Sequence, residues 1–186
     1  MRSGVKKLHL TNLDDAMSLF ARCCEKDPYY QRLFGTADAY IDIKSSFRPD
    51  VENAILSGIA LGYFKDRELV GLLLAINVND WRNNHLDSYM HLFQSDRDIA
   101  EVWYQDIKTV FKNENSNLIY IFQLVVDEHM RMRKIATKLL ESLLWKYGRK
   151  FTIFSDLSNA KANRLWTNKG FKNIRTKGGN NFVIKN

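Results

Sequence analysis

The sequence contains few of the residues that break, cross-link or anchor a chain. Proline occurs only twice in 186 residues, which excludes a proline-rich linker. The two cysteines, Cys23 and Cys24, are adjacent and cannot form an ordinary disulfide with each other, so we expect free thiols in a reducing compartment. No Cys-x-x-Cys pair or Cys/His cluster indicates a metal site.

Long apolar runs are also missing. No stretch approaches the ~20 apolar residues of a membrane-spanning helix, and the N-terminal segment lacks the apolar core of a signal peptide. We therefore expect a cytoplasmic protein with no metal and no membrane contact. The chain is 45% hydrophobic and 26% charged, which is typical of a soluble globular protein. Its length favours one compact domain over residues 1–186.

The positive charge is concentrated near the C-terminus. Residues 129–186 contain 14 lysines and arginines but only two acids, whereas residues 1–128 contain 14 basic and 19 acidic residues. A segment this basic attracts a polyanion, which could be a nucleic acid, a membrane surface or a phosphorylated cofactor. The alternative is a solvated basic face with no partner.

Hydrophobic periodicity predicts strands and helices in mixed order. Expected strands cover 5–10, 118–126 and 151–154, a hairpin joins 59–64 to 69–78, and 171–174 pairs with 182–184. Expected helices cover 13–24, 37–57 with a break at Pro49, 98–112, 135–147 and 158–169. Helical spacing assigns Trp103 and Trp145 to the core. The predicted class is α/β or α+β, with a largely antiparallel sheet.

One segment combines a strand, a basic turn and a helix. The strand ends at Leu124, Val125 and Val126, the polar turn covers 127–134, and the helix begins at Ile135. A helix N-terminus carries unpaired N–H groups and partial positive charge, which suit a phosphate. Four cationic side chains add charge there, namely Arg131, Arg133, Lys134 and Lys138. We expect a pyrophosphate to bind across this turn.

The same segment resembles the GNAT superfamily of acyl-CoA-dependent N-acyltransferases. That family has an Arg or Gln followed by Gly-x-Gly-x-Gly/Ala at this turn; here Arg131 and Ala136 fit, while Met132 and Lys134 stand where two glycines are usual. A second block, residues 159–171, matches the family's pattern at Asn159, Leu165, Gly170 and Phe171.

The resemblance implies a fold and a cofactor. It implies a mixed, mostly antiparallel sheet flanked by helices and splayed between its fourth and fifth strands, with acetyl-CoA as co-substrate in the gap. The pantetheine arm would bond to the backbone of the strand end, Leu124, Val125 and Val126, and Asn159 would contact the cofactor from the other side. The pyrophosphate would meet backbone amides of Arg131, Met132, Arg133, Lys134, Ile135, Ala136 and Thr137.

The resemblance leaves the acid and the base without clear candidates. Many family members have a Tyr as general acid where this chain has Trp166, whose indole N–H is not a proton donor at neutral pH. Many have a Glu base where this chain has Tyr120, whose ordinary pKa of ~10 makes it a poor base. The unassigned segment 80–95 contains further titratable residues, namely Asp80, His85, Asp87 and His91, and no base is assigned.

The resulting hypothesis is an N-acetyltransferase. An amine of a small molecule or protein would attack the acyl group directly. The alternative is a degenerate GNAT domain that binds CoA or another ligand without turnover. A nucleic-acid partner is not expected, because the sequence contains no recognised nucleic-acid-binding motif. The acceptor and the acyl group stay open; so does the oligomeric state, with a homodimer as one alternative.

Overall fold

A computed structural model describes residues 3–34, 39–77, 105, 118–148, 150–156, 160–177 and 181–185. The chain divides into two compact units. The first comprises Met1–Ile76 and Gln123–Lys146, and the second comprises Asn77–Phe122 and Tyr147–Asn186. The segment 80–95, most of the expected helix 98–112 with Trp103, and Asn159 all lie outside the described residues.

The described strands form a seven-stranded sheet with the order β1-β2-β3-β4-β5-β7-β6. Among the strand pairs with a defined register, only β4 and β5 run parallel, and the others are antiparallel. The sequence therefore predicted the mixed, mostly antiparallel class correctly. The strands are β1 (Gly4–Lys7), β2 (Ala60–Lys65), β3 (Glu68–Asn77), β4 (Leu118–Val126), β5 (Thr152–Asp156), β6 (Lys172–Arg175) and β7 (Asn181–Lys185).

In the first unit, β2 and β3 form the predicted hairpin. Lys65 pairs with Glu68, so the loop has two residues, Asp66 and Arg67, with φ values of 51° and 78°. Positive φ at both positions gives the twist that a tight hairpin needs. The strand expected over 5–10 is shorter than predicted, because β1 ends at Lys7 and a 3-10 turn begins at Leu10.

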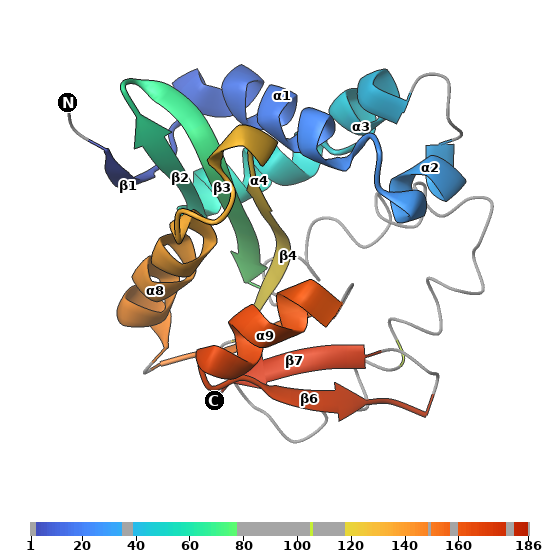
Figure 1. The fold of residues 1–186 in the computed structure, drawn as a ribbon, viewed down its shortest axis with the longest axis vertical. Coiled ribbons are helices and arrows are strands. Elements are labelled where there is room, and N and C mark those ends of the chain that lie inside the picture. Colours follow the sequence, from blue (N-terminus) through green and yellow to red (C-terminus); the bar gives the residue numbers. More distant parts are fainter. Residues whose placement is uncertain are drawn as a thin grey trace. The chain divides into compact units, whose positions relative to one another are not determined.

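Helices α1 (Leu13–Cys24), α2 (Pro28–Phe34), α3 (Ala39–Ser46) and α4 (Arg48–Ser57) follow the expected pattern, apart from α2, which the sequence did not predict. Figure 1 shows α1, α3 and α4 lying together, and these helices contact one another. Pro49 lies in the first turn of α4, so it separates α3 from α4 as expected. The buried face of α1 supplies much of the core, including Met17 and Phe20.

Helix α8 (Ile135–Tyr147) has the predicted bounds and lies beside β2 and β3 in Figure 1. Its buried residues are Ile135, Leu139, Leu140 and Leu143. The prediction that Trp145 belongs to the core is wrong, because its exposed fraction is 88%. Two residues beyond Leu143, a side chain is rotated by roughly 200° around the helix and faces away from the apolar stripe.

The second unit has its own core. The predicted pairing of the last two strands is confirmed, with Lys172 opposite Ile184 and Arg175 opposite Asn181. Helix α9 (Ala160–Asn168) lies within the range predicted for it. Large buried side chains of this unit include Phe154, Phe182 and Trp166. No helix among the described residues combines the length and apolar character needed to cross a bilayer.

Candidate functional site

Strand β4 changes character halfway along its length. Its first four residues, Leu118–Ile121, are buried and pair with β5. The remaining five residues, 122–126, are half-buried and lie beyond the β4–β5 register, which ends at Ile121 and Ser155. Ser155 Oγ donates to the carbonyl oxygen of Ile121 at 2.8 Å. The end of β4 therefore lies beyond its pairing with β5.

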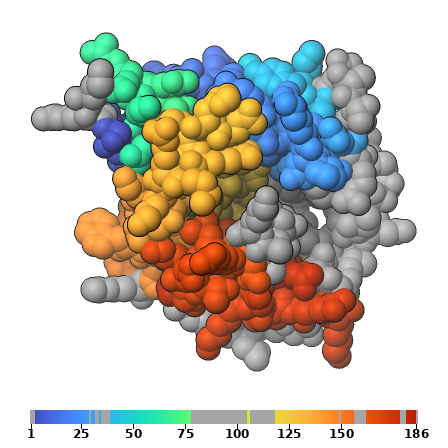
Figure 2. All heavy atoms as spheres, in the orientation of Figure 1, coloured from blue at the N-terminus to red at the C-terminus, as the bar shows by residue number. Residues whose placement is uncertain are grey.

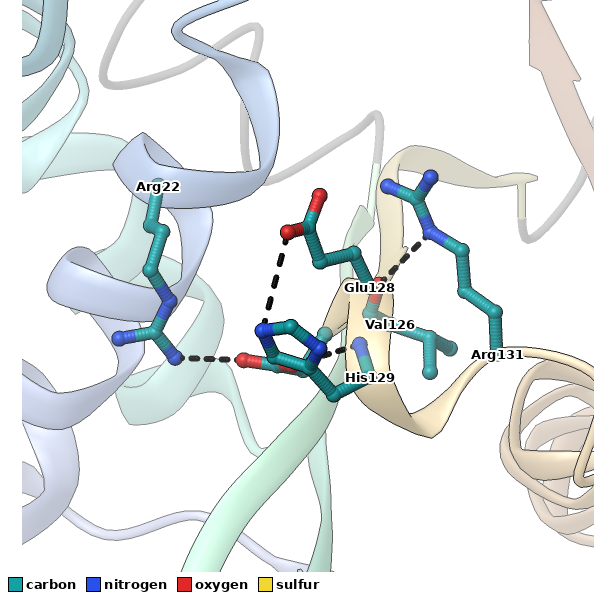
Figure 3. A network of polar contacts seen from close by, with 6 residues as sticks. Arg22, Val126, Glu128, His129 and Arg131 are labelled. Carbon is teal, nitrogen blue, oxygen red and sulfur yellow. Dashed lines mark hydrogen bonds and ion pairs between the residues drawn. The ribbon is translucent and has the colours of Figure 1, made fainter.

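The basic turn, residues 127–134, is held in place at its first residue. The N–H of Asp127 donates to the carbonyl oxygen of Val70 in β3 at 3.0 Å. Asp127 Oδ1 accepts from the N–H of His129 at 3.1 Å, and Oδ2 accepts from Arg22 Nη2 at 2.9 Å. Figure 3 shows Arg22 of α1 reaching toward the turn. The Asp127 carboxylate thus joins the turn to α1, and the Asp127 backbone joins the turn to β3.

Two residues of the basic turn have a left-handed backbone. The φ values are 63° at Met132 and 59° at Lys134. These are the two positions at which the family pattern described in the sequence analysis usually has glycines. The Met132 side chain is 99% exposed, so it points into solvent. Successive backbone N–H groups in such turns form a concave anion-binding nest.

Residues 132–137 of this segment present a run of backbone N–H groups. Among the described residues, the amides of 132–137 donate no hydrogen bond, and the first amide bonded in the following helix is Lys138, to the carbonyl of Lys134 at 3.0 Å. Three of these amides belong to the first turn of α8, where a helix leaves its N–H groups unpaired. The helix dipole adds partial positive charge at the same point. The arrangement suits a phosphate group.

The start of α8 is seated directly on β3. A Cβ added at Gly71 would lie 2.6 Å from Ile135 Cγ2 and 3.3 Å from Leu139 Cδ1. Only a residue without a side chain allows the first turn of α8 to pack this closely. Val70 and Gly71 therefore hold the two ends of the basic turn from one strand.

Cationic side chains surround the unpaired amides. Arg131, Arg133, Lys134 and Lys138 are all exposed, and the turn lies at the surface in the amber region of Figure 2. Arg131 Nε donates a long hydrogen bond of 3.5 Å to the carbonyl oxygen of Val126 (Figure 3). Lys138 Nζ lies 3.4 Å from Tyr63 Oη on β2. The field across the turn favours an anion.

The end of β4 also contacts α1 and α2 through a polar group that the sequence analysis missed. Gln123 Nε2 donates to Cys24 Sγ at 2.9 Å and to Tyr30 Oη at 3.3 Å. Burial raises the pKa of the Cys24 thiol far above its usual range and that of Cys23 to about 11. Both thiols are free. These partners lie about 100 residues apart, so no local pattern announces them.

The two catalytic candidates lie in the second unit. Tyr120 is buried and stacks on Phe154 with ring centroids 5.1 Å apart. Trp166 is buried against Phe171, with centroids 4.9 Å apart. Asn159 and the four titratable residues of 80–95 lie outside the described residues. Within the described stretches, no three His, Cys, Asp or Glu side chains gather closely enough to hold a metal ion.

Comparison with protein families gives one match that covers most of the chain. The model of the acetyltransferase (GNAT) family matches residues 13–171. This range includes the basic turn, the end of β4 and α9. A search of curated proteins finds no match.

Solved structures with the same fold match nearly the whole chain. The apo form of a mutant agmatine N-acetyltransferase has a TM-score of 0.69 at 13% identity, covering 98% of each chain. The Drosophila melanogaster polyamine N-acetyltransferase has a TM-score of 0.69 at 12% identity, covering 98% of this chain and 99% of its own. The PaiA N-acetyltransferase from Thermoplasma acidophilum, in complex with coenzyme A, has a TM-score of 0.62 at 15% identity, covering 100% and 99%. At these identities the likeness concerns the fold.

Proposed function

The chain belongs to the acetyltransferase (GNAT) family, and from that premise we propose that it is an N-acetyltransferase that uses acetyl-CoA and acts on a primary amine. When bound, acetyl-CoA supplies an activated thioester that the amine attacks directly. The proposal is of one GNAT-like domain over residues 1–186. A small-molecule acceptor is favoured, because two of the structural neighbours are an agmatine and a polyamine N-acetyltransferase.

The observation that carries the proposal is the run of amides at 132–137, which have no acceptor in the part of the chain that the structure describes. Backbone N–H groups bind a pyrophosphate when they converge and when no internal acceptor competes for them. Arg131, Arg133 and Lys134 add charge that a neutral ligand would not need. A phosphorylated cofactor therefore accounts for both the backbone and the side chains of the turn.

The missing glycines do not remove the fit. Glycine is common in phosphate turns because it adopts positive φ without strain and leaves space for the ligand. Met132 and Lys134 already have positive φ, and the Met132 side chain lies in solvent. The turn thus keeps the backbone shape of a phosphate turn at a cost in strain. The positive charge of Lys134 attracts the phosphate.

The end of β4 is the proposed seat of the pantetheine arm. Leu124, Val125 and Val126 are half-buried and lie past the end of the β4–β5 register. Extended backbone beyond a strand pairing offers N–H and carbonyl groups to an amide-containing ligand. Asn159 is retained as a further cofactor contact on the family resemblance alone.

The proposal does not require a side-chain acid at position 166. The Trp166 indole N–H cannot protonate a leaving group at neutral pH, and the ring packs against Phe171. A thiol leaves as a thiolate more readily than an amine or an alcohol leaves without a proton. We therefore propose no proton transfer by Tyr120 or Trp166.

Three further parts of the proposal concern the location, the acceptor and the assembly of the protein. Cytoplasmic location rests on the two free thiols, which suit a reducing compartment. A protein amine as acceptor and a homodimeric assembly rest on the family resemblance. A panel of amines and a sedimentation measurement test these two points.

Binding is tested by thermal melting with acetyl-CoA, dephospho-CoA and desulfo-CoA. We expect acetyl-CoA to raise the melting temperature and the loss of phosphate to weaken the shift. The double variant Arg131→Glu/Lys134→Glu should abolish the shift. The matched control is Lys172→Glu/Arg175→Glu, which reverses two exposed charges on β6 and should leave the shift unchanged. Equal shifts in both double variants would contradict the phosphate assignment.

Turnover is tested by thiol release from acetyl-CoA in the presence of primary amines. Amine-dependent release supports the transferase. CoA-dependent stabilisation without release from any amine supports the degenerate binding domain instead. Absence of both would reject the cofactor proposal.

A further inference from the structure

The amide of Gln123 is held from one end. Its Nε2 donates to Cys24 Sγ at 2.9 Å and to Tyr30 Oη at 3.3 Å, and all three side chains are partly or fully buried. A primary amide has two N–H donors, so these two contacts use both of them. The orientation of the amide is therefore determined by α1 and α2, not by solvent.

The other end of the same amide is its carbonyl oxygen, Oε1. Among the described residues, no N–H or O–H donates to Gln123 Oε1. A carbonyl oxygen in a half-buried position loses free energy unless a water molecule or a ligand donates to it. Within the described part of the chain, the structure thus presents one oriented acceptor atom that no protein donor satisfies.

Gln123 lies next to the segment of β4 that is assigned to the cofactor. Gln123 immediately precedes Leu124–Val126, the segment to which the proposed function assigns the pantetheine arm, and it follows Ile121, the last residue of β4 that pairs with β5. Under the proposed function, the Gln123 amide therefore lies beside the cofactor segment of β4, where the attacking amine would have to reach the thioester.

We propose that Gln123 Oε1 accepts a hydrogen bond from the acceptor amine, and that Cys24 and Tyr30 are positioning residues that hold the Gln123 amide for it. This inference rests on the proposed function and names a residue of the same site. The amide neither gains nor loses a proton. It orients the amine by accepting one of its N–H groups.

The surroundings of Gln123 indicate the class of amine. Tyr30 packs edge-on against Phe20 and Phe47, with ring centroids 6.0 and 5.7 Å apart. The neighbouring Cys24 is an uncharged thiol, because burial raises its pKa. Asp27 adds negative charge near Cys24, which favours an amine that arrives as an ammonium ion. We therefore expect a primary amine.

Binding of 2-phenylethylamine to the CoA-saturated protein tests this inference without turnover. We expect Gln123→Leu to raise the calorimetric Kd for the amine about tenfold, the loss of roughly one hydrogen bond. The Kd for CoA should stay unchanged. Gln31→Leu, which removes an amide from α2, is the matched control and should bind the amine as the wild type does.

Steady-state kinetics separates the roles. Tyr30→Phe and Cys24→Ala should each raise the KM for the amine by a few fold with the KM for acetyl-CoA constant, because they release the Gln123 amide without removing it. Cys24→Ser restores an acceptor for Gln123 Nε2. A KM for the amine near that of the wild type in this variant would show that Cys24 positions the Gln123 amide and does not act through packing alone.

Two results would overturn the inference. Gln123→Leu that binds 2-phenylethylamine as tightly as Gln31→Leu does would exclude contact with the amine. This result leaves the proposed function intact if the wild type still releases thiol with an amine. A wild type that shows no CoA-dependent stabilisation would instead contradict the proposed function and this inference together.

Discussion

Met132 and Lys134 have the same left-handed backbone conformation, with φ values of 63° and 59°, on either side of Arg133. For residues with a Cβ this conformation costs about 1–2 kcal/mol each. A short turn accepts such a cost when its shape is needed. Here the shape leaves the amides of 132–137 without an acceptor among the described residues, so the strain and the proposed phosphate contact belong to one feature.

The first prediction is that glycine at position 132 stabilises the protein. Met132→Gly removes the left-handed strain but increases the conformational entropy of the unfolded chain, and the net gain should be about 0.5–1 kcal/mol. Thermal melting should show a rise of roughly 1–4 °C. Because Met132 is 99% exposed, no core packing is lost.

Met132→Ala is the control for that prediction. It removes the exposed side chain but keeps the Cβ, so it should leave the melting temperature near that of the wild type. The affinity for CoA should be equal or higher in the glycine variant, since the backbone shape is retained. A lower melting temperature for Met132→Gly than for Met132→Ala would contradict the strain argument.

The second prediction concerns the seat of α8. Gly71→Ala places a Cβ 2.6 Å from Ile135 Cγ2, so the buried Ile135 side chain, α8 or β3 has to shift. We expect a loss of about 1–3 kcal/mol in the free energy of unfolding, measured by denaturant titration, and weaker CoA binding. Gly4→Ala is the matched control, because a Cβ at Gly4 meets nothing within 4 Å. Equal stability of the two variants would show that the contact yields at no cost.

Some parts of this molecule could be predicted from the sequence with the correct bounds. β4 (Leu118–Val126) is a nine-residue run of mostly apolar, β-forming side chains. α8 (Ile135–Tyr147) has its apolar residues at helical spacing. Both signals are local, which is why they can be recognised without the fold. α2 (Pro28–Phe34) was missed, because its clustered aromatic residues carry no clear helical period.

The contacts that shape the candidate site could not be predicted in this way. Arg22 and Asp127 lie 105 residues apart, and the Gln123 contacts to Cys24 and Tyr30 span 99 and 93 residues. The left-handed backbone at Met132 and Lys134 is also invisible in the residue types, because neither residue favours positive φ. Tertiary packing determines all of these features. The sequence supplied the charge and the place of the turn.

The third prediction separates the two roles of Asp127. Asp127→Ala removes both the acceptor for the His129 N–H and the ion pair with Arg22, and should lower the free energy of unfolding by about 1–2 kcal/mol. Arg22→Ala removes only the ion pair, in which the Arg22 side chain is 52% exposed, and should cost at most about 1 kcal/mol.

Asp127→Asn sharpens this comparison. It retains an acceptor for the His129 N–H and loses the negative charge, so its stability should match that of Arg22→Ala in denaturant titrations. CoA affinity should fall more in Asp127→Ala than in Asp127→Asn, since only the alanine variant frees the first residues of the turn. Identical losses of unfolding free energy in Asp127→Ala and Arg22→Ala would show that the contact between the Asp127 carboxylate and the His129 N–H does not stabilise the protein.

The fourth prediction concerns Asp50, in the first turn of α4. Its side chain is buried, and burial raises its pKa to about 7, with no charged partner contributing. In the folded protein Asp50 therefore keeps its proton at pH values where the unfolded chain has lost it. Its contribution to stability is present below about pH 4, falls as the pH rises toward 7 and is lost above that value.

Asp50→Asn should remove this pH dependence, because asparagine stays neutral at every pH. From pH 4 to pH 7 the unfolding free energy of the variant should therefore rise relative to that of the wild type. The rise should be up to about 4 kcal/mol, because the pKa of Asp50 is raised by about three units. Denaturant titrations at pH 4, 5.5, 7 and 8 measure it. Asp15→Asn, at an exposed position of α1, is the control and should parallel the wild type. A variant curve parallel to that of the wild type across this range would mean that Asp50 is ionised in the folded protein, and the burial argument would then be wrong.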